Sequence, residues 1–98
     1  AAGNFVRSFG TYGQGLGKFA RPKGIALDEK GRIYVADSWQ NVIQVFDQRG
    51  RFEAILTDES GELLDLGSPS GIAVDGNRVY IAERLARRLQ IRELVDEE

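Results

Sequence analysis

The sequence predicts an all-β fold built from two β-propeller blades, and three observations lead to this prediction. Residues 22–28 (PKGIALD) recur as residues 69–75 (PSGIAVD) 47 positions later, so the 98-residue chain contains two copies of one unit. In each unit, short apolar runs alternate with Gly, Asp and Asn, which is typical of strands joined by tight turns. The runs are apolar on both faces. Such a sheet has to be covered on both sides, as a propeller blade is covered by its neighbours.

Each unit is expected to form a four-stranded antiparallel sheet. Glycines in the loops 29–31 and 76–77 suit tight hairpins, because glycine adopts positive φ without steric cost. Pro22 and Pro69 are expected just before the first strand of each unit, where a missing N–H removes no ladder hydrogen bond. The expected strands are residues 24–28, 32–36, 42–47 and 52–56 in the first unit, residues 71–75, 78–82 and 88–92 in the second, and an outer strand at residues 5–9.

The second strand of the first unit illustrates the pattern of the faces. Ile33 and Val35 point to one side of the sheet, whereas Tyr34 and Ala36 point to the other, and all four are apolar or aromatic. The fourth strand, which contains Glu53, is more polar, as the outer edge of a blade should be.

The composition excludes several kinds of chemistry. Basic residues number 13 and acidic residues 15, and this net charge of −2 argues against a strongly electrostatic nucleic-acid binder. The chain has no His and no Cys, which removes the commonest general base, the commonest metal ligand and every thiolate. We therefore expect no cofactor and no catalytic activity. No apolar run reaches the ~18 residues of a membrane span. The pair Ala1-Ala2 suits a signal-peptidase cut and favours a secreted or periplasmic location.

Four motifs together resemble the NHL repeat. They are residues 22–28, residues 31–38 (GRIYVADS), residues 43–47 (IQVFD) and residues 50–52 (GRF). The resemblance implies a β-propeller, usually of six blades. It divides the chain into an outer strand plus a first repeat at residues 1–49, a second repeat at residues 50–95 and a charged tail at residues 96–98. Members of this family serve as protein-binding scaffolds, RNA-binding modules or sensor domains, and one branch is a lyase whose zinc is held by histidine.

The resemblance also implies a carboxylate–arginine pair after the second strand. Asp37 has no arginine at the matching position of the first unit, whereas Glu83 and Arg88 occupy the two positions in the second unit. Asp28 and Asp75 close the first strand of each unit, and we expect them to stabilise turns by accepting backbone N–H groups. The acidic loop at residues 58–65 is either a solvated loop or a site for a hard cation such as calcium.

Candidate partner-binding residues lie in loops that the strand order brings to one end of the blades. Trp39, the sole tryptophan, is either an exposed anchor for a partner protein or a cover for a neighbouring blade edge. Arginines in the matching turn of the second unit either pair with the acidic loop, contact a partner protein or bind phosphate. The predicted partner-binding residues are Trp39, Gln40, Tyr12, Arg84, Arg87 and Arg88.

The favoured interpretation is a non-enzymatic propeller module that acts as a protein-interaction or structural scaffold. One alternative is a fragment of a larger NHL propeller enzyme or sensor domain whose active residues lie elsewhere. A third interpretation is an RNA-binding module, although nucleic acid is the less favoured partner because of the net charge.

The strand order predicts assembly. The second unit lacks an outer strand, whereas the N-terminus carries a spare one that contains Phe5, Val6 and Phe9. If this strand completes the last blade of a neighbouring copy, a head-to-tail ring of three chains contains six blades. The predicted assembly is therefore a homotrimer formed by strand exchange. The alternative is that other propeller segments or subunits supply the missing blades.

Overall fold

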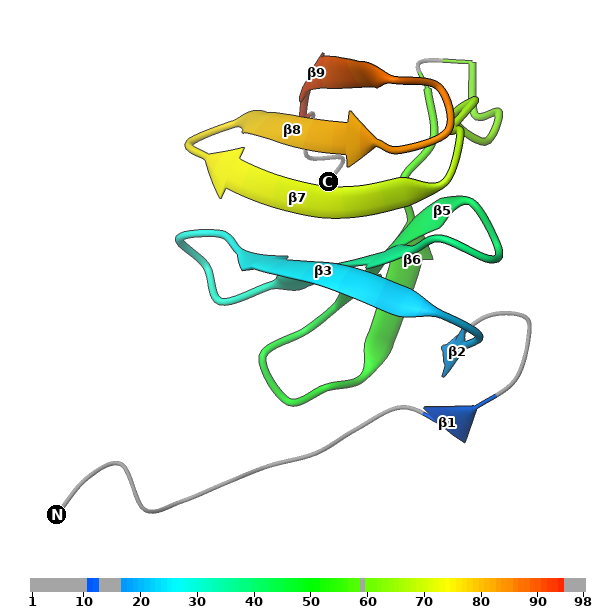
Figure 1. Ribbon diagram of the computed structural model, residues 1–98. Coiled ribbons are helices and arrows are strands. Elements are labelled where there is room, and N and C mark those ends of the chain that lie inside the picture. The colour runs from blue at the N-terminus through cyan, green and yellow to red at the C-terminus, as the bar shows by residue number, and fades with distance from the viewer. Residues whose placement is uncertain (1–10, 13–16, 59, 95–98) are drawn as a thin grey trace, which may run out of the picture.

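The computed structural model describes residues 11–12, 17–58 and 60–94, and their fold is all-β. Two antiparallel sheets lie one above the other (Figure 1). The described residues form no helix, and so none that is long and apolar enough to cross a membrane. The predicted fold class is confirmed. The predicted assembly strand with Phe5, Val6 and Phe9 lies outside the described residues.

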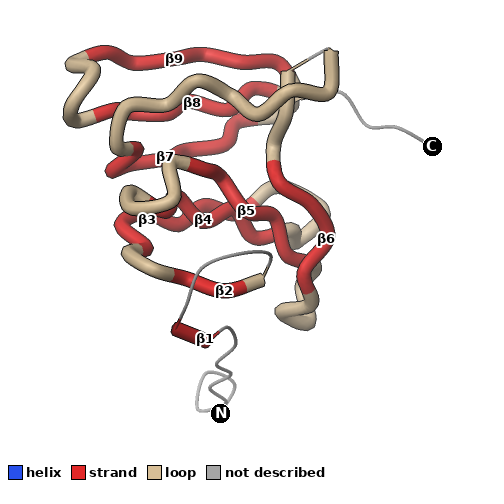
Figure 2. Tube along the Cα trace, turned by 90° about the vertical axis from the view of Figure 1, so that its right-hand side faces the viewer, coloured by secondary structure: helices blue, strands red, loops and turns tan. Residues whose placement is uncertain are grey.

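The first unit forms a four-stranded blade. It comprises β3 (Pro22–Leu27), β4 (Ile33–Asp37), β5 (Val42–Phe46) and β6 (Phe52–Ile55), which pair in chain order. The register sets Ala36 opposite Ile43, so these two side chains share one face of the sheet. Two short parallel strands, β1 (Thr11–Tyr12) and β2 (Lys18–Phe19), lie below β3 in both ribbon views (Figures 1 and 2).

The second unit forms a three-stranded sheet. It comprises β7 (Pro69–Asp75), β8 (Arg78–Glu83) and β9 (Arg88–Glu93). Within the described part of the chain, β9 pairs only with β8, whereas its counterpart β5 has a strand on each side. One edge of the second sheet is therefore open in these residues.

The expected position of the two prolines was wrong. Pro22 and Pro69 are the first residues of β3 and β7 and pair with Asp37 and Glu83. Each is followed by a one-residue register shift before the next glycine of the strand. A proline is tolerated there because the first position of an edge strand, next to a bulge, does not require its N–H.

The two blades pack against each other through one apolar face each. β7 lies against β3 and β4. The buried cluster between the blades takes side chains from β4, β5 and β8 and from the connection between the blades. Its members are Tyr34, Ala36, Ile43, Val45, Leu64, Leu66, Val79 and Ile81. Burial of one such large apolar side chain contributes about 1.5–3 kcal/mol, so this cluster is a major source of stability.

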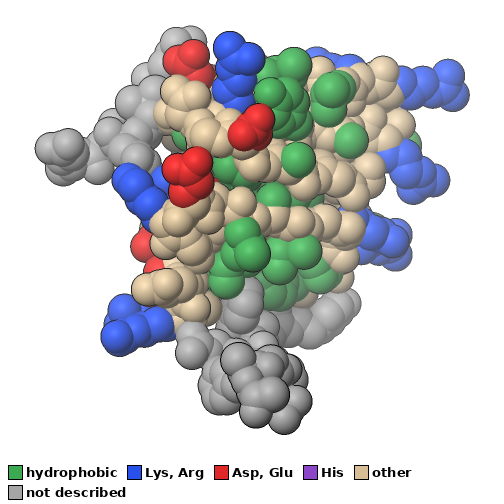
Figure 3. All heavy atoms as spheres, turned by 90° about the vertical axis from the view of Figure 1, so that its left-hand side faces the viewer, with side chains coloured by type: hydrophobic (Ala, Val, Ile, Leu, Met, Phe, Trp, Pro, Cys, Tyr) green, Lys and Arg blue, Asp and Glu red, His purple; other side chains and the backbone are tan. Residues whose placement is uncertain are grey.

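The outward faces of the blade pair carry exposed apolar side chains among the described residues. Ile25 and Leu27 on β3 are exposed, as are Leu89 and Ile91 on β9. Hydrophobic side chains reach the surface over both the upper and the lower blade (Figure 3). Among the described residues, the inner blade faces are thus buried against each other, whereas the outer faces keep exposed apolar side chains on β3 and β9, although Val35 on β4 is buried.

The close approach of β3 to β7 gives a first prediction. A Cβ added at Gly24 would lie 3.1 Å from the Cα of Gly71 and 3.3 Å from the carbonyl oxygen of Ser70. Gly24→Ala is therefore expected to push the blades apart and to lower the free energy of unfolding by about 1–3 kcal/mol. Urea unfolding in dilute solution, followed by circular dichroism, measures this change.

Gly71→Ala is the matched control, because its Cβ would meet only the Cβ of Ala82, at an ordinary contact distance of 3.6 Å. Its free energy of unfolding should be unchanged or slightly raised, since alanine restricts the unfolded chain more than glycine does. Equal losses of stability in the two variants would contradict the inferred packing.

Candidate protein-interaction surface

One end of the blade pair gathers the predicted partner-binding loops. The β4–β5 turn, the β8–β9 turn and the connection between the blades lie together at the right of Figure 1. Asn41 Oδ1 in the first turn accepts the N–H of Ser68 in the connection at 2.9 Å. The carbonyl of Ser68 in turn accepts the N–H of Arg84 in the second turn at 3.0 Å. The two turns are thus joined into one surface.

A buried carboxylate fixes the first turn. Asp37 is fully buried, and its oxygens accept the backbone N–H groups of Ala20, Trp39 and Gln40 at 2.8–3.0 Å and that of Arg21 at 3.2 Å. The Gln40 side-chain amide donates a further hydrogen bond at 3.0 Å. Burial alone would raise the pKa of Asp37, but these hydrogen bonds outweigh it and hold the pKa below its ordinary value. Backbone and amide donors thus serve where the family pattern has an arginine.

An ion pair between a buried carboxylate and a half-exposed arginine fixes the second turn. Glu83 accepts hydrogen bonds from Arg88 Nε at 2.6 Å, from Arg88 Nη2 at 3.1 Å and from the N–H of Gly67 at 2.8 Å. Burial opposes ionisation of Glu83, but the arginine and the backbone donor lower its pKa overall, and Glu83 raises the pKa of Arg88. The pairing predicted from the sequence is confirmed.

Two glutamines hold the connecting segments against the blades, and the sequence reasoning missed them. Gln44 on β5 is buried, and its amide donates to the carbonyl of Lys18 at 2.7 Å. Gln90, at the same place on β9, donates to the carbonyl of Asp65 at 3.0 Å. The sequence does contain a signal for this role, because a glutamine interrupts the apolar third strand at the same position in both units.

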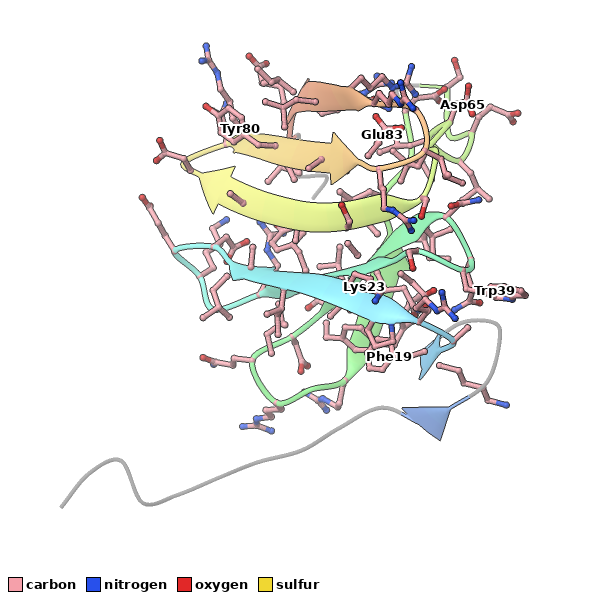
Figure 4. All side chains as sticks on the ribbon, in the orientation of Figure 1. Phe19, Lys23, Trp39, Asp65, Tyr80 and Glu83 are labelled. Carbon is pink, nitrogen blue, oxygen red and sulfur yellow. The ribbon has the colours of Figure 1, made fainter. Side chains whose placement is uncertain are left out.

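Among the predicted partner-binding residues, the side chains differ in their availability. Trp39 is 61% exposed and points outward from this end (Figure 4), with the Arg21 guanidinium 6.0 Å from the ring centroid. A cation–π contact at an exposed site is worth about 0.5–1 kcal/mol. Arg84 and Arg87 are also exposed. Arg21 was not predicted, because no sequence pattern indicates that it reaches the tryptophan.

The other predicted residues have structural roles or lie outside the described side chains. The Gln40 amide is held by Asp37 and by the carbonyl of Lys18, and Arg88 is held by Glu83. Tyr12 belongs to β1, but its side chain is not among those described.

The aspartates that end strands and turns act on the backbone. Asp28 Oδ1 accepts the N–H groups of Lys30 and Arg32, while Oδ2 accepts Arg32 Nε and the Tyr34 hydroxyl. This confirms its predicted role in stabilising the turn.

In the acidic loop, Asp58 Oδ1 accepts the N–H groups of Ser60 and Glu62 in the same way. Among the described residues, no three His, Cys, Asp or Glu side chains converge on a point where a metal ion could bind.

A small hollow lies at the opposite end, between the β3–β4 and β7–β8 turns. Its volume is about 90 Å³, and its lining includes Asp28, Lys30, Arg32, Asn77 and Leu94. Sites for drug-sized ligands are typically 300–1,000 Å³. The hollow is therefore too small for such a ligand, and it is remote from Trp39.

An all-β chain of repeated antiparallel sheets, each apolar on both faces, defines the class of propeller blades. Residues 19–46, from the end of β2 through β5, match the model of the NHL repeat. The first unit is thus an NHL repeat. The second unit repeats the same strand order over β7 to β9.

The curated relatives are much longer than this chain. Protein lin-41 of Caenorhabditis elegans is 44% identical over 52 residues, which is 53% of this chain and 4% of that protein. E3 ubiquitin-protein ligase TRIM71 of Rattus norvegicus is 51% identical over 47 residues, which is 48% of this chain and 6% of that protein. Protein brain tumor of Drosophila melanogaster is 42% identical over 78 residues, which is 78% of this chain and 8% of that protein. The chain thus spans less than a tenth of these relatives.

The Glu83–Arg88 pair gives a second prediction. Arg88→Ala removes the charged partner of a buried carboxylate, so we expect the free energy of unfolding near neutral pH to fall. In the wild type, the folded-state pKa of Glu83 lies below 4.5, so its stabilising contribution is present above that value and is lost as the pH falls through the folded-state pKa. The difference between the two proteins should therefore shrink in acid, where Glu83 is protonated in both.

Urea unfolding across a pH series measures this difference. Arg84→Ala is the control, because Arg84 is an exposed arginine of the same turn. An Arg88→Ala protein as stable as the Arg84→Ala protein at neutral pH would show that the pair does not fix the turn.

Proposed function

We propose that this chain is a non-enzymatic protein-interaction module of the NHL type and that Trp39 is the anchor of its binding surface. The observation that carries the proposal is a large aromatic side chain, 61% exposed, on a turn whose backbone is fixed by the buried Asp37 carboxylate. Tryptophan and arginine are the residues that most often dominate the energy of protein interfaces. A rigid turn lets Trp39 bind a partner without the entropic cost of ordering a flexible loop.

The charges around Trp39 indicate the chemistry of the partner. Arg21 lies beside the ring, and Arg84 and Arg87 are exposed on the turn joined to it through Ser68. A partner that fits this surface offers an apolar pocket for the indole and carboxylates for the guanidinium groups. We therefore infer an acidic protein segment as the partner.

Two other functions have less support. An RNA-binding surface needs several aromatic side chains for base stacking, and at this end only Trp39 has a described aromatic side chain in an exposed position. If the chain is a fragment of a larger propeller enzyme or sensor, the active residues lie outside this sequence, and no described residue supports that role. The ligase activity in the name of TRIM71 belongs to a protein of which this chain matches only 6%.

The scaffold part of the proposal concerns assembly. We infer that the segment with Phe5, Val6 and Phe9 adds to the edge of β9 in a neighbouring copy, because β9 has a partner on one side only among the described strands. Two blades per chain and six blades per propeller give a homotrimer. Propeller segments from another protein are the alternative occupants of the same edge.

Trp39→Ala is the third prediction, and it separates an anchor from a packing residue. Because the ring is mostly exposed, we expect the melting temperature to change little. The affinity of acidic peptides selected against the wild-type protein from a displayed random library should fall at least about tenfold, which corresponds to about 1.4 kcal/mol.

Leu85→Ala is the matched control, because Leu85 is 73% exposed at the same position of the β8–β9 turn. It should retain the affinity of the selected peptides. Selected peptides that bind equally well to the Trp39→Ala protein, or a large loss of thermal stability in that protein, would contradict the anchor role.

A further inference from the structure

The two outward faces of the blade pair correspond to the two inner faces that already pack together. We define the β8 face as Tyr80 and Ala82 on β8 with Leu89 and Ile91 on β9. The register sets Tyr80 opposite Ile91 and Ala82 opposite Leu89, so the four side chains lie on one side of the sheet. This is the side of the second blade that points away from the first blade.

The β8 face has a buried counterpart in the first blade. Tyr34, Ala36, Ile43 and Val45 occupy the same strand positions, with Tyr34 opposite Val45 and Ala36 opposite Ile43. Ile43 is 0% exposed and Val45 is 5% exposed, because the second blade covers them. Leu89 and Ile91, the counterparts of Ile43 and Val45, are 59% and 57% exposed.

The opposite side of the blade pair has the complementary face. We define the β3 face as Ile25 and Leu27 on β3 with Ile33 and Val35 on β4, which the register sets opposite one another. Its counterpart in the second blade consists of Ile72, Val74, Val79 and Ile81. Ile72 and Val74 are partly buried against the cluster between the blades, whereas their counterparts Ile25 and Leu27 are 64% and 62% exposed. Val35 is already buried, as its counterpart Ile81 is, so the open part of the β3 face lies on β3.

The backbone allows the same close contact a second time. Between the blades, Gly24 approaches Gly71 so closely that a Cβ would be 3.1 Å from the Gly71 Cα. Gly71 leaves a similar gap on the β8 face, where a Cβ would meet only Ala82. If the β8 face meets the β3 face of another chain, Gly71 takes the place of Gly24 and the other chain's Gly24 takes the place of Gly71.

The connecting segment also has its counterpart. Leu66 from the connection fills the cluster between the blades. Phe19, which precedes the first unit by the same spacing, is already packed on the first blade, with its ring 5.4 Å from that of Phe46. One polar contact has no copy, because Arg87 stands where Asn41 accepts the N–H of Ser68.

We propose that the β8 face of one chain docks on the β3 face of a second copy and so repeats the interface between the two blades. The contact is head-to-tail, so each chain uses one face for each neighbour. The occupant is a second copy because the chain's own blade pair is an example of these two faces packed together. The inference rests on the self-association in the proposed function but requires neither Trp39 nor the N-terminal strand.

Two face variants test the proposal by complementation. The β8-face variant carries Leu89→Asp and Ile91→Asp, and the β3-face variant carries Ile25→Asp and Leu27→Asp. All four side chains are more than half exposed, so each variant should keep the all-β circular dichroism spectrum of the wild type. Light scattering should show that the wild type has the mass of two or more chains of 10.9 kDa each, and this mass should fall on dilution.

Each variant alone should remain a monomer, with self-association at least about 100-fold weaker than in the wild type, because it has only one functional face. An equimolar mixture should form a dimer and nothing larger, because the intact β3 face of one variant meets the intact β8 face of the other. A contact between two identical faces cannot give this result, since one variant would then dimerise alone.

A wild type that is monomeric at millimolar concentration, a variant that still self-associates or a mixture that stays monomeric would each overturn the proposal. If a double variant fails to fold, Gly71→Val replaces the β8-face variant and Leu27→Glu replaces the β3-face variant, and the same outcomes apply.

Two further variants separate this proposal from the proposed function. Trp39→Ala should leave the masses of all these species unchanged. Deletion of residues 1–10 should leave the mixed dimer intact. Loss of the trimer in that deletion, with the mixed dimer kept, would separate strand exchange from face docking.

Discussion

The packing of one apolar blade face on the next is the contact on which this structure depends. A sheet that is apolar on both sides is stable in water only when both sides are covered, and a single blade covers neither. Here the inner faces of the two blades meet through Ile43, Val45, Val79 and Ile81, and β3 approaches β7 so closely that a Cβ at Gly24 would lie only 3.1 Å from the Gly71 Cα. The two units repeat the same apolar positions. The outward face of each blade therefore resembles the inward face of the other blade.

The loop end depends on this packing but has its own source of rigidity. Asp37 and Glu83 are buried charges at the ends of β4 and β8, and each is offset by several hydrogen bonds from the turn and the connecting segment. Removing such donors would leave a charge in a poorly solvated place, so the turns have little freedom. Trp39 stands on one of these turns, which is why an exposed aromatic residue can have a defined position. The interaction surface is thus a consequence of how the repeat ends its second strand.

Much of the fold followed from local rules. The repeat spacing and the alternation of apolar residues predicted β3 to β9 to within about two residues, and the turn role of Asp28 followed from its position after a strand. The Glu83–Arg88 pair was predicted from a resemblance and is present. The prolines were misplaced because a bulge after the first residue of a strand depends on the register with the next strand, which the sequence does not encode locally.

The missed contacts are long-range. Gln44 donates to the carbonyl of Lys18, 26 positions away, and Arg21 reaches the ring of Trp39 because the connecting segment folds back along the blade. The exposed fraction of each apolar side chain could not be predicted from the sequence either. Ile43 and Leu89 occupy the same position of the repeat, yet Ile43 is buried and Leu89 is exposed, because among the described residues only Ile43 has a second blade packed against it. A repeat in sequence therefore predicts the shape of a unit but not which of its faces are covered.

The most direct test of this account is methyl NMR with a soluble paramagnetic agent, recorded over a dilution series. In dilute solution, the methyl signals of Ile43, Val45, Val79 and Ile81 should be protected, whereas those of Ile25, Leu27, Leu89 and Ile91 should be attenuated. At high concentration, the second group should become protected and the first should not change. Attenuation of the first group in dilute solution would contradict the packing of the two blades. Attenuation of the second group at all concentrations would contradict the docking of their outer faces.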